Sequence, residues 1–243
     1  MISGSKRNKY VFILSIALNV LTVCFFVGKR IYYGYQGYKQ SHPYISPDSL
    51  KKLEKIKNKY NINCEGIFKS LPHDTTDIVF LGTSLTQGFP LQEIFNNCHL
   101  KNRGVSGNTT EDVLNRLDEV IEGRPQKVFL EIGINDLMQN ISVDSTYSNT
   151  IEIIENIKKQ SPKTKIYVQS VIPSDRSEHI PTLNGLVKSY CVKHKITYIN
   201  LYSAFDKNGL LQPGLTVDGT HLTAKGYQLW KALIVQFVAA SHR

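Results

Sequence analysis

Residues 77–85 have the sequence Asp-Ile-Val-Phe-Leu-Gly-Thr-Ser-Leu, in which a short apolar run ends at a glycine. The run is rich in β-branched and aromatic side chains, as buried parallel strands are. The Gly-Thr-Ser-Leu that follows begins a turn from this strand into a helix, so the Ser84 hydroxyl is free while nearby backbone N–H groups point toward an anion. An isolated Gly-Thr-Ser is more often a simple helix cap. The interpretation therefore depends on the rest of the chain.

Apolar runs of the same kind recur downstream, and helical patterns separate them. The further predicted strands are residues 128–132, 166–172 and 196–199, with a weaker one at 99–102. The helical patterns cover residues 109–121, 151–161, 183–190 and 229–238. This alternation predicts an α/β fold with a parallel, doubly wound sheet and helices on both faces.

The net charge of +9 is concentrated near the N-terminus. Residues 1–60 carry 11 Lys and Arg against two acidic side chains, whereas residues 61–243 carry 18 basic and 18 acidic ones. The globular part is thus neutral, and the basic side chains flank an apolar stretch. This pattern fits contact with anionic lipid head groups better than contact with DNA, so no nucleic-acid partner is predicted.

The apolar stretch is residues 10–28, nineteen residues without a formal charge. As a helix it spans roughly 28 Å, enough to cross a bilayer. No small-x-small cleavage site follows, which favours an uncleaved signal anchor over a cleaved signal peptide. A lipid-modified Cys24 is a further alternative, but Val23 stands where a small residue is required. The positive-inside rule slightly favours a cytoplasmic N-terminus. With that orientation, the part of the chain after residue 28 is expected in the periplasm or at the cell surface.

The predicted organisation has four parts: a basic tail (1–9), a transmembrane signal anchor (10–28), a basic stalk or linker with a short helix at 50–60 (29–60), and one domain (61–243). A domain of roughly 180 residues is large enough to bury a full core, so no second catalytic domain is expected.

Cysteine and histidine spacing gives no sign of a metal site. With Cys24 in the apolar stretch, an odd set of three cysteines remains, and a disulfide between Cys64 and Cys98 is permitted but not indicated. Asp218 and His221 could form half of a metal site, yet no cluster of further ligands accompanies them. No metal ion is therefore predicted from these residues.

Asp218 and His221 have a second interpretation, as the partners of a nucleophilic serine. A serine hydroxyl is a weak nucleophile until a base removes its proton, and the usual base is a histidine held by a carboxylate. Three residues apart, Asp218 and His221 can meet within one local turn. Ser84 follows a predicted strand, and ligands of such sheets bind beyond the carboxyl ends of the strands. The segment is not the Gly-x-Ser-x-Gly elbow of α/β-hydrolases, because Thr86 occupies the place of the second glycine.

Candidate donors to an oxyanion follow the next two strands. Gly107, in Gly-Val-Ser-Gly-Asn, offers an unobstructed backbone N–H; Asn135, in Gly-Ile-Asn-Asp, offers a side-chain amide; and Ser84 offers its own N–H. Taken alone, Gly107 could equally well be a simple turn residue, and Asn135 could equally well be a helix cap. Together, at three strand ends, these groups predict an acyl-transfer site.

These four segments resemble the four sequence blocks of the SGNH hydrolases, also called GDSL esterases or lipases, over nearly all of residues 77–243. The stretch 102–117 is particularly similar to the branch that contains platelet-activating-factor acetylhydrolase-like proteins and carbohydrate O-acetylesterases acting on sialate or xylan. The resemblance implies a flavodoxin-like three-layer α/β/α fold with a five-stranded parallel sheet, and no cofactor.

The resemblance also implies a role for each candidate residue. Ser84 corresponds to the nucleophile, His221 to the base and Asp218 to its partner, and Gly107 and Asn135 correspond to oxyanion donors. The family's Gly-Asp-Ser-Leu is Gly-Thr-Ser-Leu here, with Thr83 in place of the acidic residue. That position is not the triad acid, so we expect an altered hydrogen bond in this loop and an effect on efficiency rather than on reaction type.

The expected function is that of a serine esterase removing a short acyl group, most readily acetyl, from an acylated carbohydrate or lipid. The chain length leaves no room for the large lid of long-chain lipases. Two alternatives stay open: an O-acyltransferase that passes the acyl group to a surface polysaccharide, and a noncatalytic carbohydrate-binding domain. The filled catalytic positions disfavour the latter.

Overall fold

Five parallel strands form the central sheet of the computed structural model, which describes residues 46–239. The strands are β1 (Ile78–Gly82), β2 (Leu100–Gly104), β3 (Lys127–Glu131), β4 (Lys165–Gln169) and β5 (Thr197–Ile199). Their order in the sheet is β2-β1-β3-β4-β5, and every neighbouring pair is parallel. Each predicted strand overlaps one of them, so the predicted parallel sheet is confirmed, including its weakest member.

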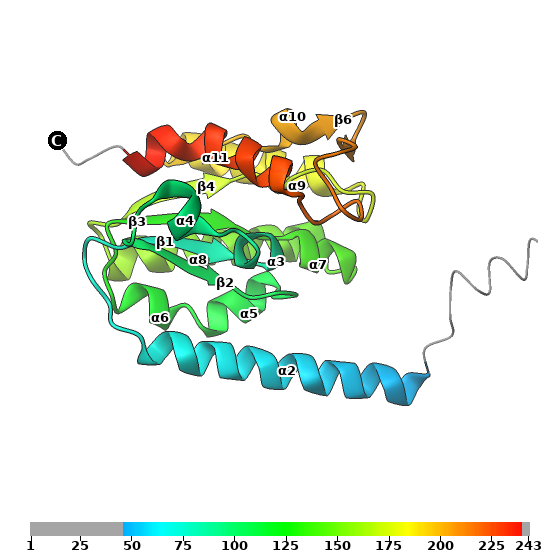
Figure 1. Cartoon of the computed structure of the whole chain (residues 1–243), viewed down its shortest axis with the longest axis horizontal. Coiled ribbons are helices and arrows are strands. Elements are labelled where there is room, and N and C mark those ends of the chain that lie inside the picture. The colour runs from blue at the N-terminus through cyan, green and yellow to red at the C-terminus, as the bar shows by residue number, and fades with distance from the viewer. Residues whose placement is uncertain (1–45, 240–243) are drawn as a thin grey trace, which may run out of the picture. The chain divides into compact units, whose positions relative to one another are not determined.

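Helices cover both faces of this sheet and complete a three-layer α/β/α fold (Figure 1). On one face lie α5 (Thr110–Asn115), α6 (Asp118–Ile121), α8 (Val143–Gln160) and α9 (Ile180–Lys193). On the other lie α4 (Leu91–Phe95), α10 (Tyr202–Phe205) and α11 (Ala224–Ala239), with a small hairpin of β6 (Asp206–Lys207) and β7 (Leu210–Leu211). Successive side chains of a strand point to opposite faces. In β3, Val128 and Leu130 accordingly join the first core and Phe129 joins the second.

Two helices differ from the sequence-based expectation. The pattern at 109–121 is divided into α5 and α6, and α8 begins at Val143 rather than at residue 151. The first turns of α8 bury Thr146 and Thr150, and the Oγ of Thr150 donates to the Thr146 carbonyl. Because these buried side chains are polar, apolar periodicity could not reveal the start of the helix.

The predicted short helix at 50–60 is part of a longer one, α2 (Pro47–Ser70). The chain divides into two compact units, residues 1–56 and 57–243, and the predicted stalk and domain limits stay predictions. The predicted transmembrane segment at 10–28 lies outside the described residues, so it stays a prediction. Among residues 46–239, no helix is both long and apolar enough to cross a bilayer. Cys64, Cys98 and Cys191 are free, so the permitted disulfide does not form.

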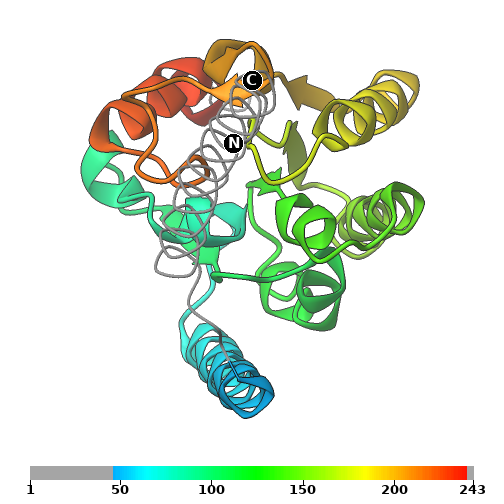
Figure 2. The ribbon, with the colours of Figure 1, turned by 90° about the vertical axis from the view of Figure 1, so that its right-hand side faces the viewer.

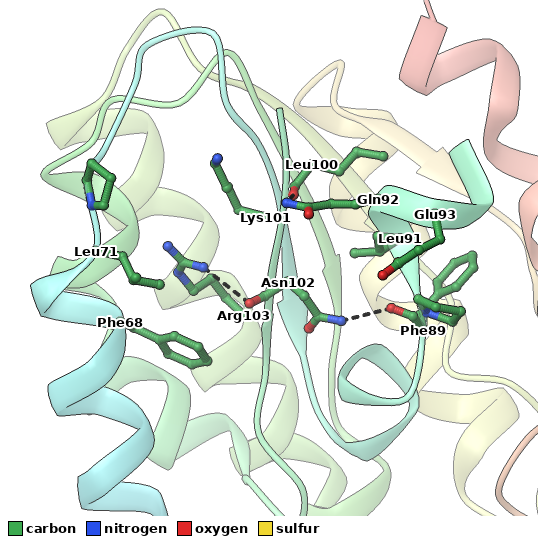
Figure 3. A pocket seen from close by; sticks show the side chains of 12 residues that line it. Phe68, Leu71, Phe89, Leu91, Gln92, Glu93, Leu100, Lys101, Asn102 and Arg103 are labelled. Atoms are coloured by element: carbon green, nitrogen blue, oxygen red, sulfur yellow. Dashed lines mark hydrogen bonds between the residues drawn. The ribbon is translucent and has the colours of Figure 1, made fainter. Parts of the chain in front are cut away.

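The outer edge of β2 is protected by side chains of the chain itself (Figure 3). The amide of Gln92 donates to the Leu100 carbonyl at 2.9 Å, and Arg103 Nη1 donates to the Asn102 carbonyl at 3.2 Å. The Gly104 N–H donates to Asn102 Oδ1 at 2.9 Å. An edge whose polar groups are already bonded is a poor template for another strand. The adjacent pocket, of about 460 Å3, is lined by none of the predicted catalytic residues.

A carboxyl group is buried at the carboxyl end of β3. Glu131 is 0% exposed, and neither of its carboxyl oxygens has a hydrogen-bond partner among residues 46–239. Burial disfavours the charged form. It raises the pKa of Glu131 from 4.5 to about 8, so the folded protein holds this side chain as a neutral acid at pH 7.

We expect Glu131 to make stability depend on pH. Between pH 4.5 and about 8 the unfolded chain releases this proton while the folded chain keeps it. The free energy of unfolding should therefore fall as the pH rises, by up to about 1.4 kcal/mol per pH unit. The free energy of unfolding of the variant Glu131→Leu should depend much less on pH. Near pH 8 this variant should be more stable than the wild-type protein. Denaturant titrations followed by the fluorescence of the buried Trp230 would measure both proteins. If the free energies of unfolding of the two proteins changed with pH in parallel, Glu131 would not be the source of the pH dependence.

Candidate active site

The turn that presents Ser84 depends on a close approach at Gly82. A Cβ on Gly82 would lie 2.3 Å from Thr86 Oγ1 and 2.6 Å from the Glu131 carbonyl oxygen, so a larger residue does not fit. The short helix α3 (Ser84–Gln87) begins directly after the extended residue Thr83. The half-buried Ser84 places its Oγ 3.1 Å from His221 Nε2.

His221 is held by Asp218 within one turn of chain. Asp218 Oδ2 lies 2.8 Å from His221 Nδ1, and Asp218 Oδ1 accepts the backbone N–H groups of His221 at 2.8 Å and Thr220 at 3.0 Å. The intervening Gly219 has a φ of 86°, which suits a residue without a Cβ. The hydrogen bond from the His221 backbone, followed by the one from its ring, lowers the pKa of Asp218 well below its usual range. An ionised Asp218 favours a proton on Nδ1 and leaves Nε2 as the acceptor facing Ser84.

The histidine and its carboxylate are open to solvent. The side chain of His221 is 50% exposed and that of Asp218 is 49% exposed. Figure 2 views the molecule from the side at which the loops after β1, β2 and β3 meet the loop before α11. The two side chains are therefore accessible from solvent on this side of the molecule.

The candidate oxyanion donors lie on the segments that directly follow β1, β2 and β3. Gly107 adopts a φ of 75° in the turn after β2. Among residues 46–239, neither the Ser84 nor the Gly107 backbone N–H donates a hydrogen bond. Asn135, in α7 (Ile134–Met138), uses one hydrogen of its amide to bond the Asn108 carbonyl at 2.8 Å, which ties it to the residue after Gly107. Its second amide hydrogen stays available.

The structure thus brings Ser84, His221 and Asp218 into one hydrogen-bonded chain and links Asn135 to the Gly107 turn. Asn135 does not cap its helix, because Gly133 occupies the N-cap position. No group of three or more His, Cys, Asp or Glu side chains within residues 46–239 is arranged to hold a metal ion.

Sequence reasoning missed the residues that support this site. Asp136 is fully buried and accepts the backbone N–H of Thr110 at 3.0 and 3.1 Å, so it joins the turn after β3 to the start of α5. Burial raises the pKa of Asp136. Asn108 and Arg116 are also buried beneath the site. An acidic residue directly after Asn135 was a visible signal, whereas nothing local marked Arg116.

Comparison with known proteins identifies the family. The model of the GDSL-like Lipase/Acylhydrolase family matches residues 73–229, and the chain belongs to this family. It is similar to the crystal structure of a GDSL-like lipase from Bacteroides thetaiotaomicron, with 28% identity, a TM-score of 0.67, and coverage of 73% of this chain and 96% of that one. The family and its structural neighbours indicate an enzyme that hydrolyses ester bonds.

Two further relatives are similar in sequence. The platelet-activating factor acetylhydrolase IB subunit alpha1 of Bos taurus is 25% identical over 190 residues, which cover 69% of this chain and 80% of that protein. An N-acylneuraminate cytidylyltransferase of Streptococcus agalactiae is 25% identical over 177 residues, which cover 72% of this chain. The match spans 41% of the length of the cytidylyltransferase.

Thr83, where the family has an acidic residue, is fully buried, and its Oγ1 has no hydrogen-bond partner among residues 46–239. Replacing an unsatisfied hydroxyl by a methyl group of the same shape costs little. We therefore expect Thr83→Val to keep esterase activity and to leave the free energy of unfolding unchanged or raised by about 1 kcal/mol.

The control is Thr110→Val, because Thr110 Oγ1 donates to Asp136 and accepts from Asn149. This variant should lose about 1–3 kcal/mol of stability. Denaturant titration of the three proteins tests the comparison. A Thr83→Val protein as unstable as Thr110→Val would show that the Thr83 hydroxyl is bonded in solution.

Proposed function

We propose that this enzyme is a serine esterase that removes a short acyl group, acetyl in particular, from a hydroxyl of a carbohydrate or lipid. The observation that carries the proposal is the hydrogen-bonded chain from Ser84 Oγ to His221 Nε2 at 3.1 Å and from His221 Nδ1 to Asp218 at 2.8 Å. This is the arrangement that a nucleophilic serine, its base and the orienting carboxylate require.

In the proposed reaction, His221 Nε2 accepts the proton of Ser84 as Oγ attacks the ester carbonyl carbon. The backbone N–H groups of Ser84 and Gly107 and the amide of Asn135 donate to the oxyanion of the tetrahedral intermediate. The intermediate collapses to an acyl-serine when His221 protonates the departing alcohol. Water then attacks the acyl-serine, with His221 again as base, and releases the carboxylic acid. Asp218 stabilises the imidazolium in both halves of the reaction.

Two features support a small acyl group on a large alcohol. The half-exposed His221 and Asp218 leave space for a bulky leaving group. The similar bovine protein is named as an acetylhydrolase, which favours acetyl. An O-acyltransferase would use the same acyl-serine, with a sugar hydroxyl in place of water, whereas a noncatalytic carbohydrate-binding domain would form no acyl-serine at all. Cytidylyl transfer is not proposed, because the candidate site provides a serine nucleophile and oxyanion donors for acyl chemistry.

The proposed location is a membrane surface, with residues 10–28 as an uncleaved anchor and the domain from residue 61 outside the cytoplasm. The support is the uncharged stretch of nineteen residues and the concentration of basic residues around it. Such an anchor would hold the enzyme close to acylated polysaccharides or lipids of the cell envelope.

The catalytic assignment predicts the behaviour of one serine variant. Ser84→Ala should lower kcat for p-nitrophenyl acetate by about a thousandfold or more, because the nucleophile acts only in the reaction steps. Ser189→Ala is the matched control, since Ser189 is exposed and its hydroxyl bonds the Gly185 carbonyl on α9. A folded Ser84→Ala protein with normal turnover would exclude Ser84 as the nucleophile. Acetylated sugar as the product, when a sugar is added, would identify a transferase.

The location predicts a fractionation result. The full-length protein should stay with membranes through high-salt and carbonate washes, because salt screens only the electrostatic part of lipid contact. Intact-mass analysis of the native protein should find an N-terminus at Met1 or Ile2. A chain that begins after about residue 28 would show a cleaved signal peptide, and a diacylated Cys24 would show a lipoprotein. Either result would contradict the proposal of an uncleaved anchor at residues 10–28.

A further inference from the structure

Arg116 is a fully buried cation beneath the candidate site. It follows α5, and its side chain is 0% exposed. A buried charge is strongly destabilising unless it is paired and hydrogen-bonded. The equally buried carboxylate of Glu119 pairs with Arg116 Nη1 at 2.5 Å and supplies the charge partner. The other two nitrogens of the guanidinium, Nη2 and Nε, donate hydrogen bonds to groups other than Glu119.

Those nitrogens bond the end of one strand and two positions near the end of another strand and in the turn after it. Nη2 donates to the carbonyl oxygens of Gly82 at 3.3 Å and Arg103 at 2.9 Å, and Nε donates to Asn108 Oδ1 at 2.7 Å. Gly82 ends β1 two residues before Ser84. Arg103 lies near the end of β2, and Asn108 directly follows Gly107. One planar group therefore holds the ends of two strands and the turn between them and α5.

A second hydrogen bond extends this connection to the third strand. The side chain of Asn108 is held by Arg116, while its main-chain carbonyl accepts the amide of Asn135 at 2.8 Å. The orientation of the Asn135 amide thus depends on the position of Asn108. Any movement of Asn108 would also displace its neighbour Gly107. Both proposed oxyanion donors outside Ser84 are linked to the guanidinium through this one residue.

We propose that Arg116 is a positioning residue for the esterase reaction, which sets the Gly107 N–H and the Asn135 amide at their places relative to Ser84. The inference rests on the proposed function. Arginine suits this role because its donors form a rigid, planar fork, whereas lysine offers a single ammonium on a flexible stem. Displacement of catalytic groups by about 1 Å can cost a hundredfold in rate.

The test is the variant Arg116→Lys in the full-length, detergent-solubilised protein, assayed with p-nitrophenyl acetate. Lysine keeps the positive charge beside Glu119 but cannot reach all three acceptors. We expect kcat to fall about tenfold to a hundredfold while KM stays within about twofold, because misplaced oxyanion donors weaken transition-state binding. Wild-type kcat in a folded Arg116→Lys protein would overturn the proposal, as would a change confined to KM.

A double-mutant cycle separates positioning from general support of the fold. If Arg116 acts through Asn135, the effect of Arg116→Lys on kcat should shrink in an Asn135→Ala background, because the amide that it positions is gone. If the two substitutions lowered kcat independently, so that their effects multiplied in the double variant, Arg116 would not act through Asn135. Should Arg116→Lys fail to fold, Asn108→Ala decides instead: it removes one acceptor of Arg116 and should lower kcat in the same way. Normal kcat in Asn108→Ala would then overturn the proposal.

Lys127→Met is the matched control for burial of a cation. Lys127 is 1% exposed at the start of β3, and its ammonium donates to the carbonyl oxygens of Phe237 and Val238 at 2.8 and 2.9 Å. This variant should lower the midpoint of unfolding and leave kcat unchanged, as expected for a cation with a structural role alone.

The variant Ser84→Ala distinguishes failure of the proposed function from failure of the role assigned to Arg116. An active Ser84→Ala protein defeats the proposed function, whereas an inactive one beside a fully active Arg116→Lys protein defeats only the role of Arg116.

Discussion

β1 lies between β2 and β3 in the sheet although it precedes both in the chain, and the rest of the site depends on this placement. The chain leaves β1 toward one side of the sheet and later returns to the other, which opens a crevice at the carboxyl ends of the strands. The segments that follow these three strands carry Ser84, Gly107 and Asn135. The fold thus assembles groups from three distant segments at one edge of the sheet.

Burial and exposure divide the polar side chains into two sets. Arg116 and Glu119 are fully buried, and their bonds fix backbone carbonyls and Asn108. His221 and Asp218 are half-exposed and depend on a local turn for their geometry. The buried set makes the scaffold rigid, where a low dielectric strengthens hydrogen bonds. The exposed set stays accessible to solvent.

Local sequence signals were sufficient for the sheet and for the contact between the two candidate residues Asp218 and His221. Short runs rich in β-branched or aromatic residues located four of the strands, a weaker signal at 99–102 located β2, and the spacing of Asp218 and His221 predicted their contact. The start of α8 was missed because Thr146 is buried there in place of an apolar residue. Arg116 could not be found in this way. An arginine in a helical pattern is usually on the surface, and its burial depends on distant partners such as the Gly82 carbonyl.

The most direct test of the account is covalent labelling with a fluorophosphonate, which reacts with a serine activated by a neighbouring base. We expect one adduct per chain, on the peptide that contains Ser84, and little or none in His221→Ala, because the base that activates the hydroxyl is then missing. Labelling at another serine, or undiminished labelling of Ser84 in His221→Ala, would contradict the hydrogen-bonded chain from Ser84 to Asp218 as the centre of catalysis.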